Sequence, residues 1–472
     1  MGEEIEKAGF EDQDFRDFDQ RLKQETDLLE IWFNSNRFAG GHATGGFELE
    51  AWLVDESFRP SARNDEFLER LNDGLVVPEL SKFNLEFNTP PNELKGRALS
   101  IMEKNLSATW RRAGGAAAEM GLKLMMIGIL PTIRNADLSE ENMSNAERYR
   151  AINEQIFRIR KGKPLHLKIE GEDTLESEHM DVMLEAGTTS FQVHLKVKQR
   201  QAADFYNAAK IASAPLVAIS ANSPFLFGKN LWAETRIPLF EAAVSVGKWD
   251  YCERVTFGVR HIDDSLMEVF VANRQRYPSL LPSIFEDPPK AMRHLRLHNG
   301  TIWRWNRPIL GFEEDGTPHL RIEHRVMPAG PTCIDCIANA AFYYGLVNEL
   351  GRRMPQVKWE IPFAESRDNF YAAARYGLEA ELEWGAGRTE RADRLILDTL
   401  LPIARTGLDG LGIHADDRDR YLGIIEARAK SGQTGAAWQR AWVAENGKDM
   451  AGLSKAYFER QESGSPVHEW PL

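Results

Sequence analysis

The sequence predicts an α+β fold, in which an antiparallel sheet has one apolar and one polar face and helices pack outside it. Four segments alternate between apolar and polar residues, as half-buried strands do: 46–54, 83–88, 190–198 and 320–326. Segments with helical periodicity separate these strands. From residue 351 onward the chain reads as mainly helical, which predicts a C-terminal helical extension.

The first strand carries Glu48 and Glu50 on its polar face, two residues apart. Two carboxylates side by side repel each other unless a cation lies between them. Magnesium is a hard divalent cation that proteins hold with a few carboxylates together with the phosphates of a nucleotide. This strand therefore predicts a Mg²⁺ site.

The polar faces of the other three strands carry the same kinds of residue. They present Asn84, Glu86 and Asn88; Gln192, His194, Lys196 and Lys198; and Arg321, Glu323 and Arg325. Any one of these strands alone is better explained by a solvated sheet face. Together they predict metal ligands and phosphate-binding cations converging on one surface. His324 falls on the apolar side of its strand and is expected to be structural.

Helices and one buried strand are predicted between and after the alternating segments. The helices are 11–34, 98–121, 142–160, 202–220, 336–347, 368–383 and 416–430, and the buried strand is 124–130. Arg148 and Tyr149, in the middle of the third helix, are expected on a solvated face. We expect the aromatic and proline-rich end, 466–471, to dock on the surface of the domain.

Composition describes an ordinary globular chain of 472 residues with 43% hydrophobic and 27% charged residues. The net charge of −13 argues against binding to nucleic acid or to an anionic membrane. Three cysteines are too few for a disulfide scaffold, and Cys333 and Cys336 are expected to pack in a helix rather than to form a redox pair. The acidic N-terminus has no secretion signal, and the apolar runs are too short to span a bilayer, so we expect a cytoplasmic protein.

An ordered set of motifs resembles a known family. Gly46-x-Glu48-x-Glu50, Glu79 with Asn84-x-Glu86, Gln192-x-His194, the segment 221–225 and Ile322-Glu323-x-Arg325 follow one another in the chain. This order is similar to the second group of the glutamate–cysteine ligase family, which includes carboxylate–amine ligases, over about residues 40 to 350. The resemblance implies a glutamine-synthetase-like catalytic fold with a curved antiparallel sheet that forms a funnel. It also implies an ATP-dependent reaction through an acyl phosphate, with a role in glutathione biosynthesis.

The resemblance implies roles for individual residues. The predicted metal ligands are Glu48, Glu50, Glu86, Glu323, His194 and Glu79, for Mg²⁺ or Mn²⁺. Glu79 reaches the site only if the chain bends at residues 81–82. Arg325 is expected to face the phosphates of ATP, and Arg236 to hold a substrate carboxylate. The remaining predicted contacts to nucleotide or substrate are Gln192, Arg304, Asn222 and Lys196.

Three functions stay open at this point. The first is a ligase that joins glutamate, through its γ-carboxylate, to an amine such as cysteine, another amino acid or a polyamine. The second is a non-catalytic nucleotide- or metabolite-binding protein, and the third is a Mg²⁺-dependent phosphohydrolase. We expect residues 1–350 to form the catalytic core and 351–472 to pack on it, with no nucleic-acid or membrane partner; homo-oligomer formation is left open.

Overall fold

The computed structural model describes residues 5, 9–246, 253–385 and 387–472. The acidic N-terminal segment and Cys252 therefore lie outside the described residues, apart from Ile5. Within the described ranges, no helix is long and apolar enough to cross a membrane.

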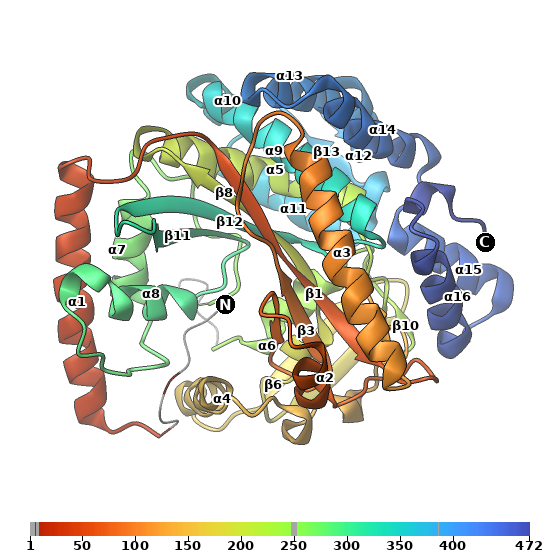
Figure 1. Cartoon of the computed structure of the whole chain (residues 1–472), viewed down its shortest axis with the longest axis horizontal. Coiled ribbons are helices and arrows are strands. Elements are labelled where there is room, and N and C mark those ends of the chain that lie inside the picture. The colour runs from red at the N-terminus through yellow and green to blue at the C-terminus, as the bar shows by residue number, and fades with distance from the viewer. Residues whose placement is uncertain (1–4, 6–8, 247–252, 386) are drawn as a thin grey trace.

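One antiparallel sheet forms the centre of the molecule (Figure 1). Its strands lie in the order β11 (Asn306–Phe312), β12 (Pro318–Pro328), β8 (Ser190–Val197), β1 (Thr44–Val54), β3 (Asn84–Asn88) and β2 (Val76–Pro78). Two short strands, β4 (Asn92–Glu93) and β5 (Lys123–Met125), also pair with β1. The sheet twists and curls across the molecule, so that one of its faces is concave.

Strand register brings the predicted polar residues together. Glu50 lies opposite Glu86 on the neighbouring strand β3, and Glu48 lies opposite Gln192 on β8. His194 is in turn opposite Glu323 on β12. Because alternate residues of a strand face the same side, these side chains share one face of the sheet. The apolar residues of β1, such as Leu49 and Ala51, are fully buried on the other face.

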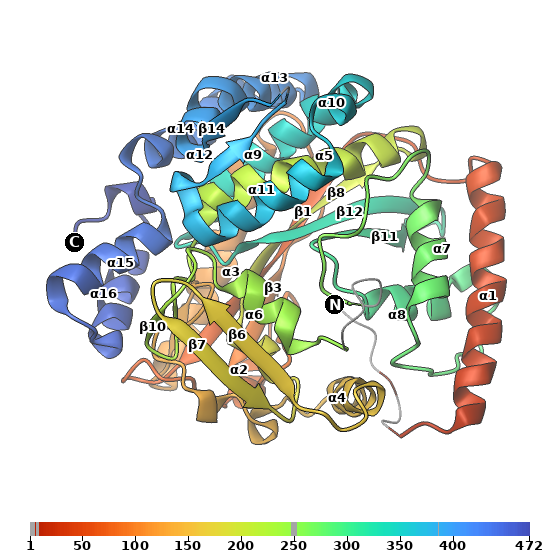
Figure 2. The same cartoon turned by 180° about the vertical axis from the view of Figure 1, so that it is seen from behind.

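Helices cover the sheet on its outer sides (Figures 1 and 2). The helices that come before residue 333 are α1 (Asp12–Asn34), α2 (Asn64–Leu71), α3 (Ala98–Glu119), α4 (Glu147–Ile159), α5 (Ala202–Ser220), α6 (Arg236–Ala243), α7 (Met267–Arg276) and α8 (Arg293–Gly300). Two hairpins, β6 (Leu165–Glu170) with β7 (Thr174–His179) and β9 (Phe225–Leu226) with β10 (Lys229–Asn230), complete this part. The predicted α+β class with helices outside a curved sheet is confirmed.

The C-terminal part is mainly helical, as predicted. It contains α9 (Cys333–Arg352), α10 (Met354–Glu360), α11 (Phe363–Tyr376), α12 (Ala392–Leu395), α13 (Leu401–Leu411), α14 (Ala415–Ser431), α15 (Gly435–Asn446), α16 (Met450–Glu462) and the hairpin β13 (Glu381–Glu383) with β14 (Thr389–Arg391). The predicted boundary at residue 350 falls inside α9, so the division into two regions stays a prediction. A Cβ on Gly407 of α13 would lie 1.8 Å from the carbonyl oxygen of Gly345 on α9, so only glycine allows these helices to pack so closely.

Two predicted elements end several residues earlier than expected. The helix predicted over 368–383 ends at Tyr376, because Gly377 has a positive φ of 60° and turns the chain. The buried strand predicted over 124–130 ends at Met125. Side chains bond the backbone beyond it: Gln461 accepts from the amide of Met126 at 2.7 Å, and Trp52 donates to the carbonyl of Ile127 at 3.0 Å.

Two smaller predictions are confirmed. Cys336 is fully buried inside α9, and burial raises the pKa of the Cys333 thiol to about 12, so this pair packs in a helix. The C-terminal end docks as predicted, because the indole of Trp438 donates to the carbonyl of Pro471 at 3.0 Å and packs edge-on against Trp470.

Candidate active site

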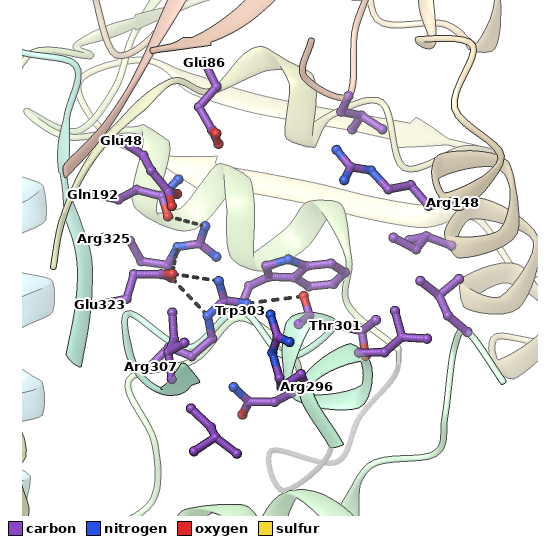
Figure 3. Close-up of a pocket in the computed structure, with 18 of the residues that line it drawn as sticks. Glu48, Glu86, Arg148, Gln192, Arg296, Thr301, Trp303, Arg307, Glu323 and Arg325 are labelled. Carbon is purple, nitrogen blue, oxygen red and sulfur yellow. Dashed lines mark hydrogen bonds and ion pairs between the residues drawn. The ribbon is translucent and has the colours of Figure 1, made fainter. Parts of the chain in front are cut away.

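A cavity of about 530 Å³ lies over the polar face of the sheet. Its charged and aromatic lining residues include Glu48, Glu50, Glu79, Glu86, Arg148, Tyr149, Glu185, Arg296, Trp303, Arg307, Arg321, Glu323 and Arg325, together with Gln192. Figure 3 shows Glu48, Gln192, Glu323 and Arg325 along one wall, with Arg148 across the cavity from them. The sheet thus supplies one wall of the cavity, and α4, α6 and the segment before β11 supply others.

Strands β1, β8 and β12 contribute one metal-ligating side chain each. Glu48, His194 and Glu323 place one ligand atom apiece within 4.8 Å of one another. His194 lies opposite Gly46, which has no side chain, and its Nε2 is 3.3 Å from Glu48 Oε1 and 3.9 Å from Glu323 Oε2. This buried Nε2 makes no hydrogen bond to any described residue. Two carboxylates and an uncommitted imidazole nitrogen fit a divalent cation. We call these residues the Glu48–His194–Glu323 triad.

Both carboxyl groups of the triad are held ionised. Burial raises the pKa of Glu323, but Arg307 and Arg325 outweigh it and lower the pKa to about 2. Burial also opposes ionisation of Glu48, whose pKa is nevertheless well below the ordinary value because of the neighbouring His194. Carboxylates must be deprotonated to bind a metal, so both are in the form that a cation requires.

Arginine side chains surround the triad on the same wall. Arg307, directly opposite Glu323 in the sheet, donates to both of its carboxylate oxygens at 3.0 and 2.7 Å. Arg325 donates to Gln192 Oε1 at 2.8 Å and lies 3.4 Å from Glu323. Buried Arg325 Nη1 and Arg321 Nε have no hydrogen-bond partner in the described part of the chain. These unused donors on a cavity wall suit a phosphate or a carboxylate of a ligand.

Two of the other predicted ligands on the sheet have raised pKa values. Glu50 accepts hydrogen bonds from the Ser190 amide at 2.6 Å and from Gln192 Nε2 at 2.8 Å. Burial and the nearby Glu79 raise the pKa of Glu50 to about 7. Burial, followed by Glu48 and Glu79, raises the pKa of Glu86 well above its ordinary value. The structure brings both into the cavity but outside the triad, so their role as metal ligands stays a prediction.

Glu79 reaches the cavity through the bend that the sequence analysis required. Strand β2 ends at Pro78 and β3 begins at Asn84, and the chain turns between them. The amide of Lys82 is tied to the carbonyl of Asn142 at 2.8 Å, outside both strands. Glu79 therefore lines the cavity from a loop beside β3.

Arg236, predicted to hold a substrate carboxylate, is not among the residues that line the cavity. Its side chain is 1% exposed and forms an ion pair with buried Glu234, with Nε 3.1 Å from a carboxylate oxygen. Its guanidinium also donates to the backbone carbonyls of Arg325 and Val326. These partners hold the end of β12 in place, and the substrate-binding role of Arg236 stays a prediction.

Three more predicted contact residues lie elsewhere. Asn222 is fully buried and donates to the Ala329 carbonyl and the Tyr457 hydroxyl, both at 2.8 Å, so it holds parts of the core together. Lys196 is paired with Glu313 at 2.6 Å and is not among the residues that line the cavity. Arg304 points into a second, smaller cavity and donates to Asn273 Oδ1 at 2.5 Å. His324 is structural as predicted, with Nδ1 2.8 Å from Asn306 Oδ1.

Among the cavity residues, Arg148, Tyr149 and Arg307 were assigned otherwise or missed. Arg148 and Tyr149 line the cavity from α4, whereas the sequence analysis placed them on a solvated face. Arg307 received no role, although Asp315-Gly316 is a turn signal between two strands. Counting outward from a three-residue loop, 314–316, that ends at this Gly pairs Arg307 with Glu323, which is the observed register.

Comparison with known proteins agrees with this geometry. The model of glutamate–cysteine ligase family 2 matches residues 44–459, while no curated protein matches the sequence. A glutamate–cysteine ligase from Francisella tularensis, solved in complex with AMP, is 11% identical with a TM-score of 0.54, over 92% of this chain and 91% of that chain. A bifunctional glutathione synthetase from Pasteurella multocida is 12% identical with a TM-score of 0.49, over 93% of this chain and 53% of that chain.

The likeness to the Francisella tularensis structure shows a shared fold. The family match covers most of the chain and includes all four sheet strands that carry the triad and its arginines. The chain therefore belongs to glutamate–cysteine ligase family 2 and is an enzyme of the ligase class.

Proposed function

We propose that this protein is an ATP-dependent carboxylate–amine ligase, which joins the γ-carboxylate of glutamate to an amine through an acyl phosphate. The observation that carries the proposal is the Glu48–His194–Glu323 triad on the same cavity wall as Arg325 and Arg321. A nucleotide bound with its metal needs ligands for the metal and donors for the phosphates. The triad offers the ligands, and the unused guanidinium groups offer the donors.

The reaction needs little covalent catalysis by side chains of the protein. A carboxylate oxygen of glutamate attacks the γ-phosphorus of ATP, ADP leaves, and the amine then displaces phosphate from the acyl phosphate. The protein must position the reactants and neutralise the charge on the phosphates. The triad would hold Mg²⁺, or Mn²⁺, which supplies positive charge to the phosphates when bound. Arg325 Nη1 and Arg321 Nε, which have no hydrogen-bond partner among the described residues, would donate to the same oxygens.

The arginine positions are themselves fixed by neighbours. Gln192 accepts from Arg325 and donates to Glu50, which in turn is held by Ser190. This chain of hydrogen bonds leaves Arg325 few alternative orientations. A group that is already oriented needs no rearrangement as charge develops on the transferred phosphoryl group.

The apolar part of the cavity supports a ligase. Phe240, Val244, Phe270 and Leu281 line the cavity, and they are buried in the fold. An apolar wall limits access of water to an acyl phosphate before the amine arrives. Cysteine is the acceptor that the family name suggests, and other amino acids and polyamines are alternatives for the assay.

The test is an ADP-release assay with Mg²⁺, ATP and glutamate against a panel of amines. Hydroxylamine is included because it converts an acyl phosphate to a stable hydroxamate. We expect ADP release to require glutamate together with an amine, and glutamyl hydroxamate to form with hydroxylamine. Equal ADP release with and without amino acids would instead indicate a phosphohydrolase. Absence of ATP binding by calorimetry at millimolar Mg²⁺ would indicate a non-catalytic protein.

A further inference from the structure

A second cavity, of about 270 Å³, lies between α5 and α7, beside the segment 256–260. None of its lining residues is shared with the main cavity. Its innermost side chains are Tyr206, Lys210, Tyr277 and Arg304, all of which are at most 8% exposed.

Lys210 and Arg304 are buried cations without a carboxylate partner among the described residues. Lys210 Nζ donates one hydrogen bond, to the carbonyl of Arg260 at 2.8 Å, which leaves two of its three N–H groups for a ligand. Arg304 donates to Asn273 Oδ1 and to the Tyr277 hydroxyl, which are both neutral groups. Neither cation is therefore neutralised by the protein groups around it.

Two other deeply buried cations among the described residues are paired with carboxylates. Arg236 lies 3.1 Å from Glu234, and Arg428 lies 2.7 Å from Asp335. Burying a charge without a partner costs several kcal/mol, so an unpaired buried cation needs an explanation. The contrast points to a partner that the polypeptide does not itself supply.

Among the described residues, Glu268 is the acidic residue that lines the second cavity, and it is already engaged. Glu268 accepts hydrogen bonds from the amides of Asp263, Asp264 and Ser265 at 2.8 to 3.1 Å. Its other oxygen accepts from Arg260 at 2.5 Å. Glu268 is thus the partner of Arg260 and of a loop, and it does not compensate Lys210 or Arg304.

The groups around Lys210 also do not compensate its positive charge. Its ammonium lies 4.9 Å from the Tyr206 ring and 5.2 Å from the Phe363 ring, which attract a cation only modestly. Burial, followed by Arg304 and Arg260, lowers the pKa of Lys210 to about 7. An anion between Lys210 and Arg304 would relieve this repulsion.

We infer that the second cavity binds a small anion, either a phosphate or a carboxylate group, between Lys210 and Arg304. Its volume of about 270 Å³ is small for a nucleotide, since clefts for drug-sized ligands hold about 300 to 1,000 Å³. The apolar side chains of Val269 and Val271 also line the cavity, which leaves room for a few carbon atoms of a small organic anion. This site is separate from the one proposed for ATP and glutamate.

The test measures binding of two probes, inorganic phosphate and succinate, by calorimetry at constant ionic strength. The full-length protein is compared with Lys210→Met and Arg304→Met. Lys455→Met, which removes an exposed lysine of α16, is the control, and Arg321→Met, which removes a cation from the main cavity, reports any probe bound there. We expect at least one probe to bind, with affinity at least tenfold weaker in Lys210→Met and Arg304→Met and changed less than twofold in Lys455→Met. The probe that binds identifies phosphate or carboxylate as the ligand group.

A stability measurement separates this role from a structural one. In buffer without phosphate or succinate, Lys210→Met should unfold at the same or a higher temperature than the wild type, because it removes an unpaired buried charge. The probe should raise the unfolding temperature of the wild type but not of Lys210→Met. Failure of both probes to bind, equal binding by Lys210→Met, or loss of binding only in Arg321→Met would each overturn the inference. None of these outcomes depends on whether the main cavity is a ligase site.

Discussion

The guanidinium of Arg236 donates to the backbone carbonyl of Arg325, so two arginines with opposite situations lie in direct contact. Arg236, on α6, is paired with buried Glu234 and with two carbonyl groups at the end of β12. Arg325, on β12, lines the main cavity and keeps one buried Nη1 without a protein partner. Both side chains are buried, at 1% and 8% exposure, so burial does not distinguish them.

The difference lies in how many donors the protein leaves unused. A guanidinium has five N–H groups, and those already bonded to protein oxygens are not available to a ligand. Arg236 therefore stabilises the strand that carries Arg325, while Arg325 can act on a ligand. The comparison makes distinct predictions for stability and for catalysis.

The largest expected effect is on stability, in the variant Arg236→Met. Removing the guanidinium leaves the Glu234 carboxylate buried and unpaired, which typically costs about 3–5 kcal/mol of unfolding free energy. Urea unfolding followed by circular dichroism measures this loss. Arg97→Met, which breaks an exposed ion pair with Asp416, should change stability by no more than about 0.5 kcal/mol. If Arg236→Met keeps wild-type stability but raises the KM for glutamate, Arg236 binds substrate after all.

The next effect is catalytic and concerns Arg325→Lys. We expect kcat and kcat/KM to fall together by about 10²–10³-fold, because a lysine cannot reproduce the donors aimed at a transferred phosphoryl group. The unfolding temperature should change little, since the backbone contacts made by Arg236 remain. Steady-state kinetics with ATP and glutamate varied separately measures both parameters. A change confined to the KM for glutamate would assign Arg325 to substrate binding instead.

Metal binding by the triad gives the third prediction. Glu48→Gln should weaken Mn²⁺ binding by about 10- to 100-fold, because a neutral amide replaces a charged ligand. Electron paramagnetic resonance of free Mn²⁺ measures this affinity without any turnover. Glu313→Gln, which alters a carboxylate of the ion pair with Lys196, is the matched control and should bind Mn²⁺ normally. Unchanged Mn²⁺ affinity in Glu48→Gln would exclude the triad as the metal site.

The smallest effect concerns a second buried charge on α6, the carboxyl group of Glu241. Burial raises its pKa to about 7, although Trp305 and Tyr371 donate hydrogen bonds to it at 2.8 Å. The folded state then binds more protons than the unfolded state between the ordinary pKa of 4.5 and about 7, so stability falls as pH rises through this window.

Glu241→Gln should remove that dependence. From pH 5 to pH 7 the stability of the wild type should fall relative to this variant by about 1–2 kcal/mol. Urea unfolding at several pH values measures the difference, with the exposed residue of Glu119→Gln as control. A wild type that gains stability relative to Glu241→Gln over this range would show that the carboxyl group ionises readily in the folded protein.

Much of the fold, and the cavity wall that carries the Glu48–His194–Glu323 triad, could be predicted from local sequence patterns. The alternation in β1, β8 and β12 places Glu48, His194 and Glu323 on polar strand faces, because successive side chains of a strand point to opposite sides. The mainly helical character of the C-terminal part could also be predicted, from its Gly-rich turns and its helical periodicity. What local patterns could not supply was the shape of the loops around the cavity, and so Arg148 and Tyr149 were placed in solvent.

By itself, the sequence determined which residues share a face and which chemistry those faces offer, since strand and helix periodicity are local properties of the chain. Tertiary structure alone decided which polar groups remain available. Arg236 donates hydrogen bonds to the carbonyls of residues 325 and 326, and Asn222 donates to Ala329 and Tyr457. All of these partners are more than 80 positions away in the sequence. A donor is free or committed according to partners that are distant in the sequence, and the positions of those partners follow from packing of the whole chain.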